Sequence, residues 1–260
     1  MIGALVAALA LGAPPPGAPI PRDPAALSAR LEATNHDLAE AVDRWRAGGR
    51  ARVPRDVILD ALYEQRIVIL LTEKRALAQA VLERLPNPGP LRSELLGRRD
   101  LGRLSKPRPL RAFRTGPAEP ADRLRGYYLE AQHRFKVAWN VLAAINYVES
   151  AFNKLRNASS AGAQGPMQFI PSTWRAYGLG GNVHDPHDAI LGAANYLHAN
   201  GAPRNYRRAL FRYNPSRLYV DAVLRYARRI RSDPRAYYVV YSRQVFVRTP
   251  HGLVRLTGPR

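Results

Sequence analysis

The sequence predicts a mainly α-helical protein, in which a helical hairpin precedes a larger helical domain and a short β-element follows it. Three observations predict this class. Apolar residues recur at helical spacing over residues 25–90, helical patterns broken by Gly/Pro loops fill residues 121–232, and strand-like patterns appear in residues 233–260. With 260 residues, of which 46% are hydrophobic, the chain is long enough to bury a core.

Residues 1–24 combine an apolar leader with a proline-rich spacer. The run from Ile2 to Gly12 is too short to span a bilayer, but its length suits the apolar part of a signal peptide. It lacks a preceding positive segment, and the prolines that follow do not suit a cleavage site. We expect export or membrane tethering, with a true start farther upstream or a plain apolar leader as the alternatives.

Two amphipathic helices are expected in residues 25–90. The first runs from Ala25 to Ala47 and ends at Gly48-Gly49, and the second runs from about Arg55 to Leu85 and ends at the prolines that follow. Together they predict an antiparallel hairpin packed on the next domain. Residues 91–120 are basic and contain Pro and Gly, which indicates a solvated linker.

Charge and composition narrow the classes of partner. The net charge is +20, and 36 of the 40 basic residues are Arg, which favours nucleic acid, an anionic membrane surface or an anionic cell wall. No nucleic-acid recognition motif accompanies the charge, and the basic linker has one aromatic residue, Phe113, for base stacking. We therefore expect no nucleic-acid partner.

Metal and thiol chemistry are not indicated. The absence of cysteine excludes disulfides, thiolate nucleophiles and cysteine-based zinc sites. His184, His187 and His198 do not follow the HExxH pattern of zinc enzymes, so surface histidines are expected there. We expect neither a metal nor another cofactor.

One glutamate has the setting of a general acid. Residues Phe135 to Val148 are apolar nearly all round, which predicts a buried helix with Glu149 at its end. Burial and the negative end of the helix dipole both raise the pKa of a carboxyl group and keep it protonated near neutral pH. On helix position alone, a frayed helix end or an ion pair with an arginine explains Glu149 equally well.

A count of acids favours the catalytic interpretation. The acids after Glu130 are Glu149, Asp185, Asp188, Asp221 and Asp233. Asp185 and Asp188 are expected to cap the helix that ends near Ala199, and Asp221 to pair with an arginine. Ordinary glycosidases use two carboxylates. A single good candidate points to chemistry in which the substrate supplies its own nucleophile.

A tight loop and a helix junction follow the candidate acid. Gly162 and Gly165 permit close backbone approach or positive φ, and Pro171 suits the first turn of a short helix that Gly178 closes. After Tyr213, Asn214 is expected to cap the next helix. Each feature alone has a structural explanation, whereas their joint occurrence is more specific.

Together these segments resemble the soluble lytic transglycosylase (SLT) catalytic domain. The resemblance rests on Glu149-Ser150, on Ser159 to Gln168 with its Gly-Pro-Met-Gln end, on Ala-Ala-Asn-Tyr-Leu at 193–197 and on Tyr213-Asn214. It covers about residues 125–231. The chain departs from the common family pattern at Pro166, which replaces Leu, and at Pro215-Ser216, which replace Ala-Gly. Neither departure touches the acid.

The resemblance implies a lysozyme-like helical fold for residues 121–232 and cleavage of peptidoglycan. Glu149 would protonate the oxygen that links N-acetylmuramic acid to N-acetylglucosamine, while the muramoyl acetamido group assists departure. Glu149, then a base, would activate the 6-hydroxyl of the same sugar. The product would be a 1,6-anhydro sugar, without net hydrolysis.

The resemblance also implies roles for seven further residues. Tyr213 would hydrogen-bond near Glu149. Gln168 and Asn214 would hold either the substrate or the loop that follows the acid. Met167 and Phe169 would line the groove. Ser159 would stabilise the loop, and Ser150, next to the acid, is counted with the substrate-binding set.

Two rival functions stay open. A goose-type lysozyme on the same fold would use water as nucleophile and needs a base opposite the acid, which the spacing does not identify. A non-catalytic wall-binding module is weakened by the presence of Glu149, Gln168 and Tyr213.

The expected partners are peptidoglycan glycan strands, with anionic wall polymers or a membrane surface as further candidates. The Arg-rich end of the chain, including Arg225, Arg228 and Arg229, would steer the protein along the wall. We expect a monomer that acts outside the cytoplasm.

Overall fold

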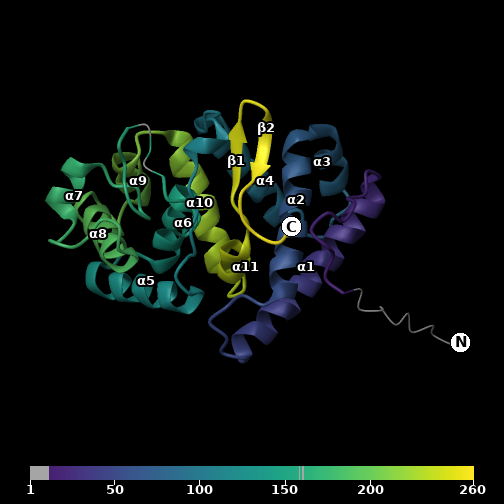
Figure 1. Cartoon of the computed structure of the whole chain (residues 1–260), viewed down its shortest axis with the longest axis horizontal. Coiled ribbons are helices and arrows are strands. Elements are labelled where there is room, and N and C mark those ends of the chain that lie inside the picture. Colours follow the sequence, from purple (N-terminus) through teal and green to yellow (C-terminus); the bar gives the residue numbers. More distant parts are fainter. Residues whose placement is uncertain (1–11, 158, 160) are drawn as a thin grey trace, which may run out of the picture.

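The computed structural model describes residues 12–157, 159 and 161–260. Most of the expected leader, residues 1–11, lies outside the described residues. The described part forms eleven α-helices, one short 3-10 helix and a two-stranded sheet, which confirms the mainly α class (Figure 1). No helix within the described ranges is long and apolar enough to cross a membrane.

The elements follow one another along the chain as α1 (Pro24–Ala47), α2 (Arg55–Glu73), α3 (Arg75–Leu82), α4 (Gly89–Leu104), η1 (Leu110–Ala112), α5 (Ala121–Phe135), α6 (Trp139–Ser150), α7 (Pro171–Tyr177), α8 (Pro186–Ala199), α9 (Tyr206–Tyr213), α10 (Arg217–Ser232), α11 (Ala236–Ser242), β1 (Phe246–Thr249) and β2 (Gly252–Arg255).

Two hydrophobic clusters form the core. The larger cluster joins α5, α6, α8, α10 and α11 to the second half of α1 and the start of α2. The smaller joins the first half of α1 to α2, α3 and α4. In Figure 1, α5 to α9 lie at one end and α1 to α3 at the other, with α4, α10 and α11 between them. The N-terminal helices therefore pack directly on the rest of the chain, and the division into separate domains stays a prediction.

The N-terminal hairpin differs from expectation in its second helix. The predicted single helix over residues 55–85 is wrong, because α2 ends at Glu73 and Lys74 has a non-helical backbone (φ −102°, ψ 83°). α3 then packs on α1 and buries Ala78, Val81 and Leu82. Neither Gly nor Pro marks this break, so tertiary packing prevails over local helix propensity.

The prediction that residues 91–120 are a solvated linker is wrong for residues 91–104, which belong to α4. Leu91 and Leu95 are buried in the smaller cluster, and Gly97 lies against the ring of Tyr226 in α10. The arginines of this helix, some of them partly buried, conceal its apolar face in the sequence. A connecting segment remains from Ser105 to Pro120.

The C-terminal segment is only partly β-structured. The run Tyr237–Tyr241, expected as a strand, lies in α11, where every residue from Ala236 to Ser242 is buried. Asp233, which ends α10, accepts the N–H of Arg235 just before this helix. A short, fully buried apolar run has no period that separates helix from strand. The expected β-element is confirmed in β1 and β2, which pair antiparallel.

The described part of the proline-rich spacer is docked on α2. The Tyr63 hydroxyl donates to the carbonyl of Pro19, and the Arg66 guanidinium donates to the carbonyls of Pro16 and Ala18. The spacer is thus held by hydrogen bonds as well as by Ile20, which packs on the smaller cluster.

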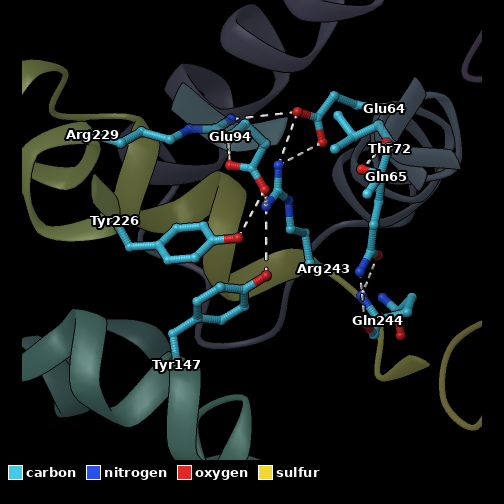
Figure 2. Close-up of polar contacts among 10 residues, drawn as sticks. Glu64, Gln65, Thr72, Glu94, Tyr147, Tyr226, Arg229, Arg243 and Gln244 are labelled. Atoms are coloured by element: carbon cyan, nitrogen blue, oxygen red, sulfur yellow. Dashed lines mark hydrogen bonds and ion pairs between the residues drawn. The ribbon is translucent and has the colours of Figure 1, made fainter. Parts of the chain in front are cut away.

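A buried network of charges connects α2 and α4 to α10 and the end of α11 (Figure 2). Arg243 donates to both carboxylate oxygens of Glu64 at 3.0 Å and to Glu94 at 2.6 Å. Arg229 contacts the same two glutamates, and the Tyr226 hydroxyl donates to Glu94. Burial raises the pKa of Glu94, but the guanidinium groups of Arg243 and Arg229 outweigh burial and lower it to about 2. Glu94 is therefore ionised at neutral pH and locks these elements together.

Candidate active site

Glu149 occupies the last turn of α6, as the sequence predicts, although the helix starts at Trp139 rather than Phe135. The chain leaves the helix through three successive residues in the left-handed region, Ala151, Phe152 and Asn153. The Phe152 side chain is fully buried in the larger cluster, which holds this turn in place. Glu149 is fixed between a buried helix and a packed turn.

A tyrosine hydroxyl contacts the acid directly. The Tyr219 hydroxyl donates to Oε1 of Glu149 at 2.6 Å, and Tyr219 itself is only 2% exposed. Burial raises the pKa of Glu149 to about 7, although the hydrogen bond from Tyr219 lowers it. A carboxyl group with this pKa is substantially protonated at neutral pH and regains a proton easily, as a general acid and base requires.

Tyr219 is the residue that sequence reasoning missed. It lies in the first turn of α10, whose N-cap is Ser216: the Ser216 hydroxyl accepts the Tyr219 N–H at 3.4 Å. The expectation that Asn214 caps this helix is therefore wrong, since Asn214 ends α9 by donating its N–H to the Leu210 carbonyl. In the sequence, Tyr219 shares an apolar helix face with valines and looks like an ordinary core residue.

Tyr213 lies close to the acid but has another partner. Its hydroxyl donates to the Met167 carbonyl at 2.6 Å, so the structure pairs Tyr219, and not Tyr213, with Glu149. Burial, together with the charges of Glu149 and Tyr196, raises the pKa of Tyr213 well above its usual value. Tyr213 thus ties α9 to the loop that precedes α7 and stays within electrostatic reach of the acid.

Met167 and Phe169 belong to the core. They are 0% and 3% exposed, which contradicts the expectation that they line a groove. The reason is the backbone of Gln168, whose φ of 52° lies in the left-handed region. The Phe169 ring packs against Trp174 and Tyr213, with centroids 5.1 and 5.8 Å away.

The expected loop-holding residues contact the loop itself. The Gln168 amide donates to the carbonyls of Asn157 and Gly165. The Ser159 hydroxyl accepts the N–H groups of Ala161 and Ala163. Both contacts help to fix the backbone of residues 161–168 beside the acid.

Ser150 faces the protein interior rather than a substrate. It is 1% exposed, and its hydroxyl donates to the Pro166 carbonyl at 2.7 Å. The Asn146 amide donates to the same carbonyl at 2.9 Å. The prediction that Ser150 binds substrate is contradicted, because its hydroxyl joins α6 to the loop.

Within the described part of the chain, no other carboxyl group contributes to the pKa of Glu149. Asp185 caps α8, as expected, and Asp221 pairs with Arg207 at 2.6 Å. Asp188 accepts the Asn182 N–H instead of capping α8, and Asp233 accepts the Arg235 N–H. Each of these four acids thus has a contact other than Glu149.

A cluster of three potential metal ligands lies at the start of α8. Asp185, His187 and Asp188 lie within reach of one metal ion, but their polar atoms contact helix N–H groups, Glu130 and Asn182. These contacts account for the cluster.

The expected wall-facing arginines are largely engaged. Arg225 lies 3.8 Å from Asp100, and Arg229 belongs to the buried network. Of the three named from the sequence, Arg228 is exposed.

Comparison with known proteins gives two kinds of match. Residues 126–231 match the family model described as the transglycosylase SLT domain. The chain is 33% identical over 150 residues to the membrane-bound lytic murein transglycosylase F of Thiobacillus denitrificans, covering 54% of this chain and 31% of that protein. It is 29% identical over 160 residues to the membrane-bound lytic murein transglycosylase F 1 of Alkalilimnicola ehrlichii, covering 56% and 32%.

The chain thus spans about a third of the length of these curated relatives. No solved structure gives a significant match.

Proposed function

We propose that this protein is a peptidoglycan lytic transglycosylase, because residues 126–231 match the family model of the transglycosylase SLT domain. The bond cleaved would be the β-1,4 link from N-acetylmuramic acid to N-acetylglucosamine. The single observation that carries the proposal is a carboxyl group with a pKa of about 7, held by Tyr219. Within the described part of the chain, no other carboxyl group contributes to this pKa.

In the first step, the protonated Glu149 donates its proton to the glycosidic oxygen, and the bond from that oxygen to the muramoyl C1 breaks. The carbonyl oxygen of the 2-acetamido group bonds to C1 and carries the positive charge. The Tyr219 hydroxyl, 2.6 Å from Oε1, stabilises the carboxylate that Glu149 becomes.

In the second step, the Glu149 carboxylate removes the proton of the 6-hydroxyl of the same sugar. The freed oxygen bonds to C1 and displaces the acetamido oxygen, which forms the 1,6-anhydro ring. The proton returns to Glu149, so the enzyme regains its starting state and no water is consumed. One carboxyl group near its pKa serves both steps, which a permanently charged carboxylate could not do.

The loop residues would position these groups. Gln168 and Ser159 hold residues 161–168, and Tyr213 joins the loop to α9. Asn214, at the junction of α9 and α10, is the remaining candidate for substrate contact from the family resemblance. We assign Ser150, Met167 and Phe169 to support of the site, because all three are buried.

The site of action would be outside the cytoplasm. Both curated relatives are named membrane-bound murein transglycosylases. A net charge of +20 attracts the protein to the anionic wall, an attraction that salt screens.

The test is the clearing of purified sacculi, followed by turbidity, with Glu149→Gln. Glutamine keeps an acceptor for the Tyr219 hydroxyl but has no proton to donate, so we expect clearing to fall by about a thousandfold or more. Glu32→Gln, the same change at an exposed glutamate of α1, should clear at the wild-type rate. Equal clearing by Glu149→Gln and the wild type would contradict the proposal.

A further inference from the structure

A pocket of about 370 Å³ with several polar side chains lies beside residues 161–168, the acid loop. It has no role in the steps above. Four segments line it, with side chains that include Glu119, Asn153, Arg156, Gln164 and His184. Asn153 also donates its N–H to the Ser150 hydroxyl, next to the acid. One lining residue of the pocket thus contacts the residue that follows the acid in the sequence.

One wall comes from the segment that the sequence presents as a linker. Thr115 forms a β-bridge with Leu155, the Gly116 N–H donates to the Lys154 carbonyl, and the Arg156 N–H donates to the Arg114 carbonyl. Residues 114–116 thus run antiparallel to residues 154–156. This pairing fixes Pro117 and Glu119 at the mouth of the pocket.

The Arg156 guanidinium is held in a defined orientation. Nη2 donates to the Pro117 carbonyl at 2.7 Å and Nε to the Asn153 carbonyl at 3.4 Å. The group lies against Gly116, where a Cβ atom would come within 2.4 Å of Cζ. Among the described residues Nη1 has no hydrogen-bond partner, so this positive group retains donors for a ligand.

The facing wall is equally fixed. A Cβ atom at Gly165 would come within 1.9 Å of the Val183 carbonyl oxygen, so the acid loop and the segment of His184 are in close contact. Glu119 brings a negative charge whose partner, Arg123, lies on the exposed side of α5 at 3.0 Å. Such an exposed pair is weak and leaves Glu119 available to a second cation.

We propose that this pocket binds the amino-carboxylate end of a peptide, with Arg156 taking the carboxylate and Glu119 the ammonium group. Guanidinium–carboxylate pairs are strong and directional, and the amides of Asn153 and Gln164 supply neutral donors and acceptors between the two charges. This inference rests on the proposed function: the ligand is the peptide stem carried by the muramoyl sugar, whose diamino acid has such an end. The pocket would then favour peptide-bearing glycan over bare glycan.

Calorimetric titration of the full chain with the tripeptide L-Ala-γ-D-Glu-meso-diaminopimelate tests the inference. We expect one-site binding, weakened about tenfold or more by Arg156→Gln and by Glu119→Gln. Amidation of the diaminopimelate carboxylates should mimic Arg156→Gln, and acetylation of its free amine should mimic Glu119→Gln. Arg228→Gln, at an exposed arginine of α10, should bind like the wild type.

Arg156→Gln removes the hydrogen bonds from Arg156 to the backbone and can therefore weaken binding through a folding defect. Glu119→Gln leaves these hydrogen bonds in place, so its effect on binding decides the result. Equal binding by the wild type and Glu119→Gln, or no binding by the wild type, overturns the pocket assignment. Cleavage of peptide-bearing sacculi by the wild type is measured alongside. Cleavage without tripeptide binding removes only this inference, whereas tripeptide binding without cleavage removes the proposed function.

Discussion

At the scale of single residues, Glu149 and Tyr219 determine the acid–base behaviour of the site. Burial raises the pKa of Glu149, and the hydrogen bond from Tyr219 opposes part of that increase. The balance, a pKa of about 7, leaves both protonation states accessible near neutral pH. Each state is needed in one of the two proposed steps.

Replacing Tyr219 by phenylalanine removes only the hydroxyl that stabilises the charged form of Glu149. The pKa of Glu149 should therefore rise above about 7. Because the first step needs the protonated acid, the alkaline limb of the pH–rate profile should move to higher pH. The rate of sacculus clearing from about pH 5 to pH 9 measures the shift.

Tyr177→Phe is the matched control. The Tyr177 ring packs edge-on against Tyr196, and its hydroxyl makes no hydrogen bond to the described residues. Its alkaline limb should coincide with that of the wild type. An unmoved or acid-shifted limb in Tyr219→Phe would show that this hydroxyl does not set the pKa of the acid.

The sequence identifies Glu149 because an apolar helix ends at a lone glutamate. It does not identify Tyr219, because a tyrosine on an apolar helix face has the same pattern whether it packs or contacts a carboxyl group. It also misplaces Met167 and Phe169. Their burial accompanies the left-handed φ of Gln168, a backbone conformation that a glutamine in the sequence does not predict.

At the scale of elements, the pairing of α1 with α2 buries an acid. Asp60 is 3% exposed, and its Oδ1 has no hydrogen-bond partner in the described ranges. Burial raises the pKa of Asp60 to about 6, and the charges of Asp37 and Asp56 contribute in the same direction. The folded state therefore holds a proton that the unfolded state releases at lower pH, so stability falls as the pH rises from about 4 to about 6.

Asp60→Asn should remove this loss. At pH values above about 6 the variant should be more stable than the wild type by on the order of 1–3 kcal/mol, because the shift of about two pKa units corresponds to about 3 kcal/mol before screening by solvent. The gain should shrink towards pH 4. Urea unfolding at both ends of this range measures it, with Glu32→Gln as the neutral control. A gain that does not depend on pH would mean that charge burial is not its cause.

Helices with a clear apolar face are predicted well from the sequence. α1 begins and ends within one residue of the predicted bounds, and the short helix from Pro171 is closed at Gly178, as predicted. α11 and the break at Lys74 are not predicted. Both depend on what the segment packs against, which local residue patterns do not contain.

At the scale of the whole molecule, the family match covers residues 126–231, but the core extends well beyond them. Figure 2 shows the Arg243 guanidinium group in contact with Glu64 and Glu94. The hydroxyl groups of Tyr147 in α6 and Tyr226 in α10 point toward this network. Tyr147 lies two residues before the acid, and its hydroxyl is 3.5 Å from Arg243. The N-terminal helices and the C-terminal segment thus brace both helices that carry Glu149 and Tyr219.

Arg243→Met keeps much of the side-chain volume but removes the more buried of the two cations that contact both buried carboxylates. Arg229 remains and, near Glu94, Arg98. We expect a loss of about 3–5 kcal/mol in the free energy of unfolding, the usual result of removing one partner of a buried ion pair. Arg231→Met, at an exposed position of α10, should change stability little. Chemical denaturation compares the two, and equal stability of Arg243→Met and the wild type would contradict a structural role for the network.

The central claim is that one carboxyl group cleaves the glycan and that the sugar supplies the nucleophile. Digestion of sacculi in heavy-oxygen water, with mass spectrometry of the released muropeptides, tests it most directly. The account predicts muramoyl ends lighter by one water than reducing ends, free of heavy oxygen and absent from the Glu149→Gln digest. Reducing ends that carry heavy oxygen would contradict it and show a hydrolase with a water nucleophile.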